Sequence, residues 1–127
     1  MEKPGHASPV EVRTSPFHGR GLFAAVSFDT GDRIAIYPLL ILDHEDSAAI
    51  RNTLIGHYVF HIDEDPDGRA RTAVAFGPIS MCNHSPDANA DFQIDVETQS
   101  ISLTARKPIA RDAEILIDYE DYASEII

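Results

Sequence analysis

The stretch "MCNHSPDANADF" at residues 81–92 is the least regular and most polar part of the sequence. It follows the hydrophobic run "AVAFGPISM" at 73–81 and leads into alternating apolar and polar residues at 90–96. Two proline or turn-forming breaks interrupt it. It gathers an amide, an imidazole and a hydroxyl, which are side chains that donate and accept hydrogen bonds. The role of this polar stretch can be inferred only from the elements and motifs that the rest of the sequence predicts.

Short runs of β-branched and aromatic residues occur along the whole chain and are separated by turn signals about every ten residues. Ile94 and Val96 oppose polar neighbours with period two, as do Ile101 and Leu103, so the residues "ETQS" between these runs are expected to form a hairpin turn. The runs that predict strands are 10–14, 33–42, 57–63, 71–76, 90–96, 100–105 and 114–119.

Only "HEDSAAIRNTLIG" at 44–56 has helical character, and Gly56 is its expected C-terminal stop. A second helical turn is expected between Pro78 and Cys82. The sequence therefore predicts a mainly β fold with many short strands and one modest helix.

The length of 127 residues is consistent with one domain that buries its own core. Cys82 is the single cysteine, so an internal disulfide or a multi-cysteine zinc cluster is excluded and no metal is expected. The N-terminus has no signal-peptide pattern, and no apolar run approaches the roughly 20 residues that cross a bilayer. We expect a soluble, cytoplasmic protein with no membrane partner, which would be nuclear in a eukaryote.

Acidic residues dominate the charge, with 21 Asp and Glu against 10 Lys and Arg and a formal net charge of −11. This sign disfavours direct contact with nucleic-acid phosphates and favours a basic partner, although acidic surfaces also serve solubility. The acidic residues gather in three groups, at 43–46, at 63–67 and at 112–125.

Three stretches together resemble the SET-domain protein-lysine methyltransferases: "HGRGLFA" at 18–24, "GPISMCNHSPDANA" at 77–90 and "RDAEILIDYED" at 111–121. They occur in the order typical of that family. A Gly-x-Gly pair alone is a weak signal, but Asn-His-Ser with Asn four residues beyond Ser85 and Ile-Asp-Tyr about thirty residues later is specific. The resemblance divides the chain into a flexible head at 1–9, a SET domain at 10–122 and a short tail at 123–127.

This resemblance implies the SET fold, in which several short curved β-sheets surround a C-terminal pseudoknot. The segment "NHSPDAN" at 83–89 would thread with "EILIDY" at 114–119, which would bury irregular polar backbone that must find internal partners. The resemblance implies that Asn83 and His84 contact S-adenosylmethionine, that main chain at Gly19, Arg20, Gly21 and Leu22 approaches this cofactor, and that Asn89 braces the pseudoknot.

The chain departs from the family pattern in two ways. Pro86 and Ala88 stand where Cys and Pro are frequent, and we expect these changes to be structural. The cysteine-rich zinc module that follows the domain in many relatives has no counterpart in this sequence. That module commonly closes one wall of the lysine channel, so here the C-terminal "EDYASEII", a neighbouring subunit of a homodimer, or nothing at all would close it.

The resemblance makes Tyr119 the first candidate for the catalytic residue and Tyr58 the second, as part of the channel wall; Tyr119 would also border the cofactor. The Tyr119 hydroxyl would orient the lysine amine. Phe60 is more typical of core, and Tyr37 and Tyr122 are equally well explained as surface-edge tyrosines. Asp118 is either catalytic or, as we prefer, a structural carboxylate.

Other chemistries fit the same residues less well. Cys82 and His84 could form a metal pair, but two ligands do not make a closed site. His84 and Ser85 are adjacent in sequence rather than arranged as base and nucleophile, which argues against a hydrolase.

The sequence therefore predicts an S-adenosylmethionine-dependent protein-lysine N-methyltransferase that acts on a basic, histone-like protein or peptide segment. The alternative hypothesis is a catalytically weak SET-like module that binds a basic partner. Retention of Asn83, His84 and Tyr119 favours the enzyme, whereas the absence of the C-terminal zinc module favours the binding module.

Overall fold

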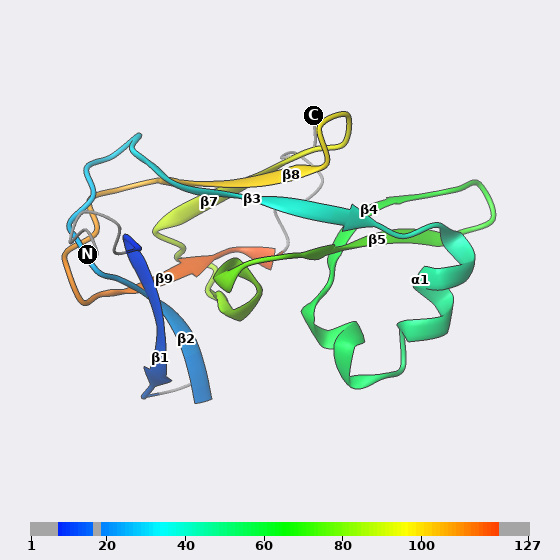
Figure 1. The fold of residues 1–127 in the computed structure, drawn as a ribbon, viewed down its shortest axis with the longest axis horizontal. Coiled ribbons are helices and arrows are strands. Elements are labelled where there is room, and N and C mark those ends of the chain that lie inside the picture. Colours follow the sequence, from blue (N-terminus) through cyan, green and yellow to red (C-terminus); the bar gives the residue numbers. More distant parts are fainter. Residues whose placement is uncertain (1–7, 17–18, 120–127) are drawn as a thin grey trace, which may run out of the picture.

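Two β-sheets build the part of the chain that the computed structural model describes, residues 8–16 and 19–119 (Figure 1). The four-stranded sheet has the order β1 (Val10–Ser15), β2 (Gly19–Ala24), β9 (Glu114–Ile117) and β6 (Asn83–His84). The five-stranded sheet has the order β4 (Phe60–Glu64), β5 (Ala70–Ala75), β3 (Arg33–Ile41), β8 (Ser100–Ala105) and β7 (Ala90–Asp95). The predicted mainly β class is confirmed.

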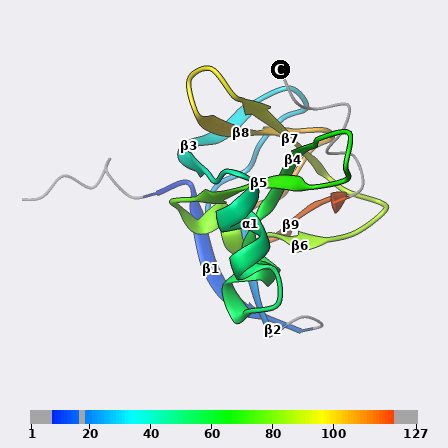
Figure 2. The ribbon, with the colours of Figure 1, turned by 90° about the vertical axis from the view of Figure 1, so that its right-hand side faces the viewer.

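The five-stranded sheet is curled, so that its two edge strands approach each other. Phe60 on β4 and Phe92 on β7 pack with ring centroids 5.8 Å apart, although three strands lie between β4 and β7 in the sheet order. Figure 2, which turns the molecule by 90°, places β4 and β7 side by side. The curl therefore brings residues from both edges to one place.

A single hydrophobic core joins the two sheets. Leu22 and Ile115 from the four-stranded sheet and Ile94, Ile101 and Leu103 from the five-stranded sheet are all fully buried members of one cluster. Burial of each such side chain stabilises the fold by about 1.5–3 kcal/mol. The alternation that predicts 90–96 and 100–105 is confirmed, since β7 and β8 pair in antiparallel register from Ala90↔Ala105 to Asp95↔Ser100.

The helix is shorter than the sequence predicts. α1 spans His44–Ile50, and the Asp43 side chain caps it by accepting a hydrogen bond of 2.8 Å from the backbone N–H of Asp46. Gly56 does not end this helix but lies inside the 3-10 helix η2 (Leu54–Tyr58), where a Cβ would come within 2.5 Å of the Ile50 carbonyl oxygen. The glycine thus permits a close return of the chain onto the last turn of α1.

Other boundaries also differ from the sequence prediction. Residues 57–58 belong to η2, so Tyr58 precedes β4 instead of lying on it. The glycine pair at 19–21 lies at the start of strand β2, and the two-residue strand β6 lies inside the polar loop. The expected turn at Pro78–Cys82 is confirmed as the 3-10 helix η3 (Pro78–Met81). No helix in the described part is long and apolar enough to span a membrane.

Candidate functional site

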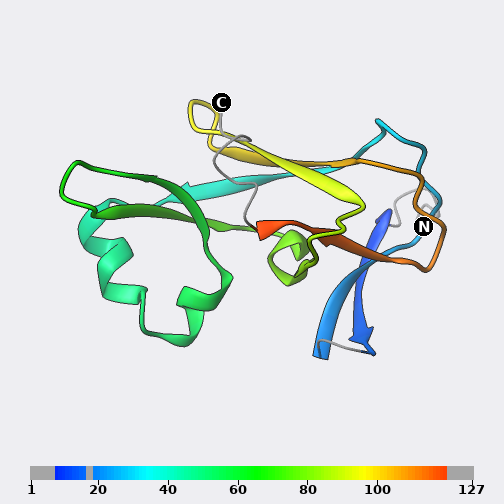
Figure 3. The same cartoon turned by 180° about the vertical axis from the view of Figure 1, so that it is seen from behind.

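The polar loop and the C-terminal strand cross as the sequence predicts. β6 pairs in parallel with β9 through Asn83↔Leu116 and His84↔Ile117, and the Ser85 N–H donates a 3.0 Å hydrogen bond to the Ile117 carbonyl. Figure 3, seen from behind, shows β9 passing beside the segment that carries η3 and the polar loop. The irregular backbone of the loop therefore finds main-chain partners on β9.

Asn89 holds the far end of this crossing. Its Nδ2 donates to the Glu114 carbonyl (2.9 Å), its Oδ1 accepts from the Leu116 N–H (2.8 Å), and its own N–H donates to the Leu116 carbonyl (3.2 Å). One amide side chain thus completes the hydrogen bonding of two residues on β9. The predicted bracing contact is present in the structure.

A polar cavity of about 230 Å³ opens beside the crossing. The Asn83 Nδ2 donates to the Arg20 carbonyl (2.8 Å) and to Glu114 Oε2 (2.8 Å), which ties the loop to the beginning of β2. The cavity is lined by Arg20, His57, Tyr58, Ser80, Met81, Cys82, Asn83 and Tyr119.

A second, largely aromatic cavity of about 190 Å³ lies next to the first. The curl of the five-stranded sheet supplies two of its walls, Phe60 and Phe92. Its lining comprises His57, Tyr58, Val59, Phe60, His61, Ser80, Phe92 and Tyr119. The two cavities share His57, Tyr58, Ser80 and Tyr119, so they meet where the two predicted catalytic tyrosines lie.

Tyr119 is held at this junction by two hydrogen bonds. Its hydroxyl donates to the Cys82 carbonyl oxygen at 2.6 Å, and its backbone N–H donates to His84 Nδ1 at 3.0 Å. Burial raises the pKa of the Tyr119 hydroxyl above its usual value, and the neighbouring Cys82 acts in the same direction. The hydroxyl is therefore protonated at neutral pH, and its proton has a fixed acceptor.

The residues predicted at 19–22 have different positions relative to the polar cavity. Arg20 lines it, whereas the Leu22 side chain is fully buried in the core and Leu22 is not part of the cavity lining; the approach of its main chain to the cofactor stays a prediction. Gly19 has a φ of +80°, a left-handed conformation that favours glycine, with open space around it. Gly21 faces Glu114 Oε2, which would lie 2.3 Å from a Cβ at that position.

Cys82 and His84 are engaged with the crossing. The buried Cys82 Sγ lies 3.2 Å from the Ile115 carbonyl oxygen, to which it donates, and burial raises the pKa of this thiol strongly. His84 Nδ1 accepts from Tyr119 and lies 3.7 Å from Asp118 Oδ1. Within the described ranges no three His, Cys, Asp or Glu side chains gather as metal ligands would.

Four residues that are not among the predicted site residues each line a cavity or bond to a residue that does: Glu114, Phe92, His57 and Ser80. Phe92 is buried on the same face of β7 as Ile94, and period-two alternation could not show that this face borders a cavity. Glu114 carries no signal of its own among the many acids of the chain. Tyr122 lies outside the described residues.

Comparison with known proteins agrees with this geometry. The family model of the SET domain matches residues 19–120. The chain is 28% identical over 123 residues to a Schizosaccharomyces pombe histone-lysine N-methyltransferase specific for H3 lysine-37, covering 96% of this chain and 80% of that protein. It is 25% identical to the Caenorhabditis elegans histone-lysine N-methyltransferase set-1, covering 93% of this chain and 53% of that protein.

Solved structures share the same fold. The Neurospora SET-domain histone lysine methyltransferase DIM-5 superposes with a TM-score of 0.69 at 23% identity, covering 89% of this chain and 52% of that one. The Chaetomium thermophilum Polycomb Repressive Complex 2 bound to S-adenosylmethionine superposes with a TM-score of 0.69 at 20% identity, covering 92% of this chain and 16% of that one.

Proposed function

The chain belongs to the SET-domain family and is an S-adenosylmethionine-dependent protein-lysine N-methyltransferase; we propose that its substrate is a lysine in a basic protein or peptide segment. The observation that carries this proposal is the junction of the two cavities at Tyr119 and Tyr58. One cavity is lined by polar groups and the other by aromatic rings. A donor and an acceptor of a methyl group need such adjoining but chemically different sites.

The residues around the polar cavity fit S-adenosylmethionine, which when bound supplies an electrophilic methyl group on a sulfonium. The donor also carries an ammonium and a carboxylate. Asn83 offers the acceptor Oδ1 toward an ammonium, since both hydrogens of its Nδ2 already have acceptors. Arg20 offers a cation for the carboxylate. Asn83, His84 and the main chain at 19–21 are therefore our proposed donor-binding residues.

The aromatic cavity suits a lysine side chain that must lose its charge before it reacts. Lysine has a pKa of about 10.4, so its neutral form is roughly 4–5 kcal/mol less populated than the ammonium at pH 7. Phe60, Phe92 and Tyr58 surround the cavity with apolar ring surface, which disfavours the charged form by desolvation. The cavity would thereby favour the neutral amine and hold it toward Tyr119.

Tyr119 is the proposed catalytic residue. Because its hydroxyl proton is donated to the Cys82 carbonyl, the lone pairs of the hydroxyl oxygen remain to accept an N–H of the lysine amine. The raised pKa keeps this group a neutral hydroxyl, so we assign it an orienting role and leave removal of the amine proton to water.

The predicted attraction of a basic substrate rests mainly on the net charge of −11. β4 runs from Phe60 at the aromatic cavity to the acidic turn at 63–67, where Asp63 pairs with Arg71 and Asp65 with Arg69. These pairs reduce the local negative potential near the turn. Long-range attraction would therefore act on association rate more than on affinity, while an extended peptide could add alongside an exposed edge strand.

Replacement of Tyr119 by Phe tests the assignment. We expect kcat for methyl transfer to basic peptides to fall about 100-fold or more, because the orienting hydroxyl is lost, while donor affinity changes less than about threefold. Labelled S-adenosylmethionine and calorimetry measure the two quantities. Tyr37→Phe is the matched control. Tyr37 lines neither cavity, so this variant should keep the wild-type kcat. A Tyr119→Phe enzyme with full kcat would contradict the role.

The same assay tests the substrate class and the alternative function. Turnover on basic peptides should weaken as salt rises from 50 to 500 mM, because salt screens long-range attraction; salt-insensitive turnover would count against a basic substrate. Tight binding of a basic protein without transfer of label would instead support a binding module. Cytoplasmic or nuclear location, a homodimer and the lack of direct nucleic-acid contact stay predictions.

A further inference from the structure

We propose that Glu114 is a positioning residue of the donor site, whose carboxylate fixes the Asn83 amide and holds negative charge beside the polar cavity. This inference rests on the donor-binding role proposed for Asn83. Glu114 lies on β9, opposite Phe23 of β2 and next to the crossing. It is one of 21 acidic residues and belongs to none of the functions assigned above.

The hydrogen bonds around Asn83 set the orientation of its side chain. Nδ2 lies 2.8 Å from both Glu114 Oε2 and the Arg20 carbonyl oxygen. Both partners accept hydrogen bonds only, so the NH₂ end of the amide must face them. A flipped amide would place Oδ1 against two other oxygens. The acceptor Oδ1 is thus the atom of Asn83 that remains for a ligand of the polar cavity.

Glu114 is itself held in place from both sides of the crossing. Its Oε1 accepts a 2.9 Å hydrogen bond from the hydroxyl of Ser15, which is buried at the end of β1. Its backbone carbonyl accepts from Asn89 Nδ2. One residue of β9 therefore connects β1, the beginning of the polar loop and its end.

Gly21 leaves the space that the Glu114 carboxylate occupies. A Cβ at this position would lie 2.3 Å from Glu114 Oε2 and 3.0 Å from Asn83 Nδ2, and both distances fall short of normal contact. Gly21 is not among the glycines with positive φ, so its backbone conformation does not require glycine. The reason for glycine here is the carboxylate, whereas the resemblance implied close approach of the cofactor.

The charge of Glu114 reaches the wall of the cavity. Its field contributes to the raised pKa of Cys82, the residue that precedes Asn83 and lines the same cavity. S-adenosylmethionine carries two positive groups, a sulfonium and an ammonium, while the demethylated product keeps only the ammonium. A carboxylate that only Asn83 separates from the ligand therefore favours the donor, which carries the additional positive charge, over the product.

A double-mutant cycle on Gly21 and Glu114 tests this inference, with affinities for donor and product measured by calorimetry. With Glu114 present, we expect Gly21→Ala to weaken donor binding about tenfold or more, since the added methyl group displaces the Glu114 carboxylate from Asn83. Glu114→Ala should cause a similar loss. In the Glu114→Ala background, Gly21→Ala should have little further effect, because Glu114 Oε2, the nearest atom that the added methyl group would contact, is gone.

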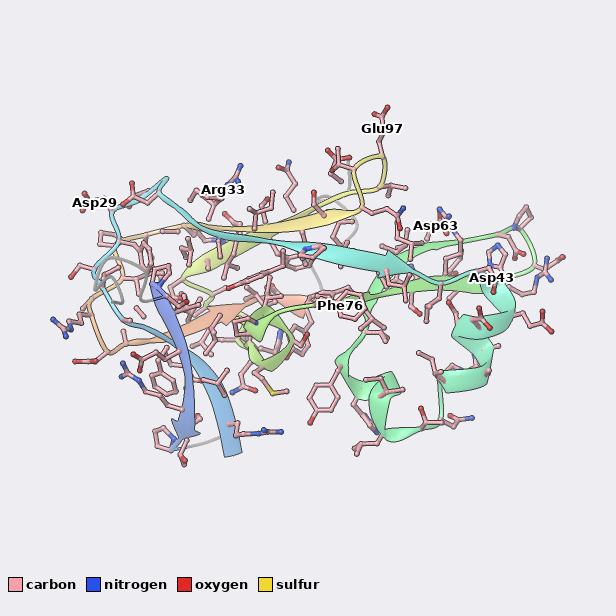
Figure 4. All side chains as sticks on the ribbon, viewed as in Figure 1. Asp29, Arg33, Asp43, Asp63, Phe76 and Glu97 are labelled. Atoms are coloured by element: carbon pink, nitrogen blue, oxygen red, sulfur yellow. The ribbon has the colours of Figure 1, made fainter. Side chains whose placement is uncertain are left out.

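Two further variants separate position from charge and remain informative where Glu114→Ala does not fold. Glu114→Gln can accept from Asn83 and donate to Ser15, so it should keep product affinity within about threefold while donor affinity falls further. Ser15→Ala removes the hydrogen bond to Glu114 Oε1 but keeps the carboxylate charge, so it should weaken both ligands to a similar, smaller extent. The Asn83 side-chain amide in NMR spectra of the ligand-free variants reports its orientation independently of activity. Glu97→Gln, at the tip of the β7–β8 hairpin (Figure 4), is the charge control and should change nothing.

The outcomes distinguish this inference from the proposed function. If Gly21→Ala costs as much in the Glu114→Ala background as in the wild type, the glycine makes room for the ligand and the role of Glu114 is overturned. An unchanged Asn83 amide signal and unchanged affinities in Glu114→Gln and Glu114→Ala would overturn it too. Failure of the wild type to bind donor or product would instead refute the donor site itself.

Discussion

The crossing of β6 with β9 and the α1 end of the molecule are built in opposite ways. At the crossing, Asn89 and the backbone ladder give the irregular chain a dense set of internal hydrogen bonds. At the other end, α1, η2 and the β4–β5 hairpin line an open cavity of about 550 Å³, and Ser47 connects the helix to β5. Asn83 and Tyr119, which are proposed to bind the donor and to orient the amine, therefore lie where several hydrogen bonds fix the chain, whereas the α1 end borders an open space.

The largest expected effect comes from Asn89→Ala, which should lower the free energy of unfolding by about 2–4 kcal/mol. The change leaves the Leu116 N–H and the Glu114 carbonyl without their partner, and each unsatisfied group costs about 1–3 kcal/mol. Urea denaturation measures it. Asn52→Ala, in the exposed connection after α1, is the matched control and should cost less than about 0.5 kcal/mol. Equal losses of stability in the two variants would show that the crossing is not more strongly fixed than the α1 end.

An alkaline loss of stability should be the next largest effect and should originate at the crossing. Burial raises the pKa of Cys82, and more weakly those of Tyr119 and Tyr37. A raised folded-state pKa gives stability that is fully present below the unfolded-state value, about 8.5 for a thiol, and is lost as pH rises toward the folded-state value. The slope for Cys82 should be up to about 1.4 kcal/mol per pH unit.

Urea unfolding at pH 7.5, 9 and 10.5 measures this slope, and Cys82→Ala should flatten it. Unfolding at acid pH makes the same measurement for the α1 end. The lowered pKa values of Asp63 and Asp65 near this end give stability that is lost below about pH 4. The Asp63 side chain is 48% exposed and the Arg69 side chain that pairs with Asp65 is 65% exposed, so solvent screens both ion pairs and this acid loss should be small. A Cys82→Ala slope equal to that of the wild type would show that the thiol is not the source.

The smallest predicted effect is that of Ser47→Ala, about 1–2 kcal/mol of stability with methyl transfer retained. The buried Ser47 hydroxyl accepts from the Thr72 N–H at 2.9 Å, and its removal leaves that donor unpaired. Thermal unfolding and the methyl-transfer assay together measure the result. Ser27→Ala, at an exposed position, is the control. Loss of turnover at temperatures where Ser47→Ala is folded would show that the two regions are coupled.

Local patterns in the sequence predicted most of the strands but not how they meet. Period-two alternation located β7 and β8 because a half-buried strand presents its side chains to opposite faces in turn. Strand β2 is not among the predicted strands, since its two glycines are a residue type depleted in strands and its pairing with β1 and β9 is tertiary. Similarly, no local pattern separates the end of α1 at Ile50 from the 3-10 helix that follows.

Some residues of the candidate site could likewise be predicted from the sequence, and others could not. Asn83, Asn89 and Tyr119 could be found from the sequence because they lie in short, specific motifs. Phe92 and Glu114 could not, since their roles depend on the curl that brings β7 to β4 and on the register that sets β9 against β2.

By itself, the sequence determined the fold class, the family resemblance and the two segments that cross, because these depend on residue types at short spacings. Only the tertiary structure decided that Glu114 fills the space left by Gly21 and that the Tyr119 hydroxyl faces the Cys82 carbonyl. These contacts join residues far apart in the chain, such as Asn83 and Arg20, which are 63 positions apart. Their geometry follows from strand register and sheet curl, which arise when distant segments pack together and which no local pattern encodes.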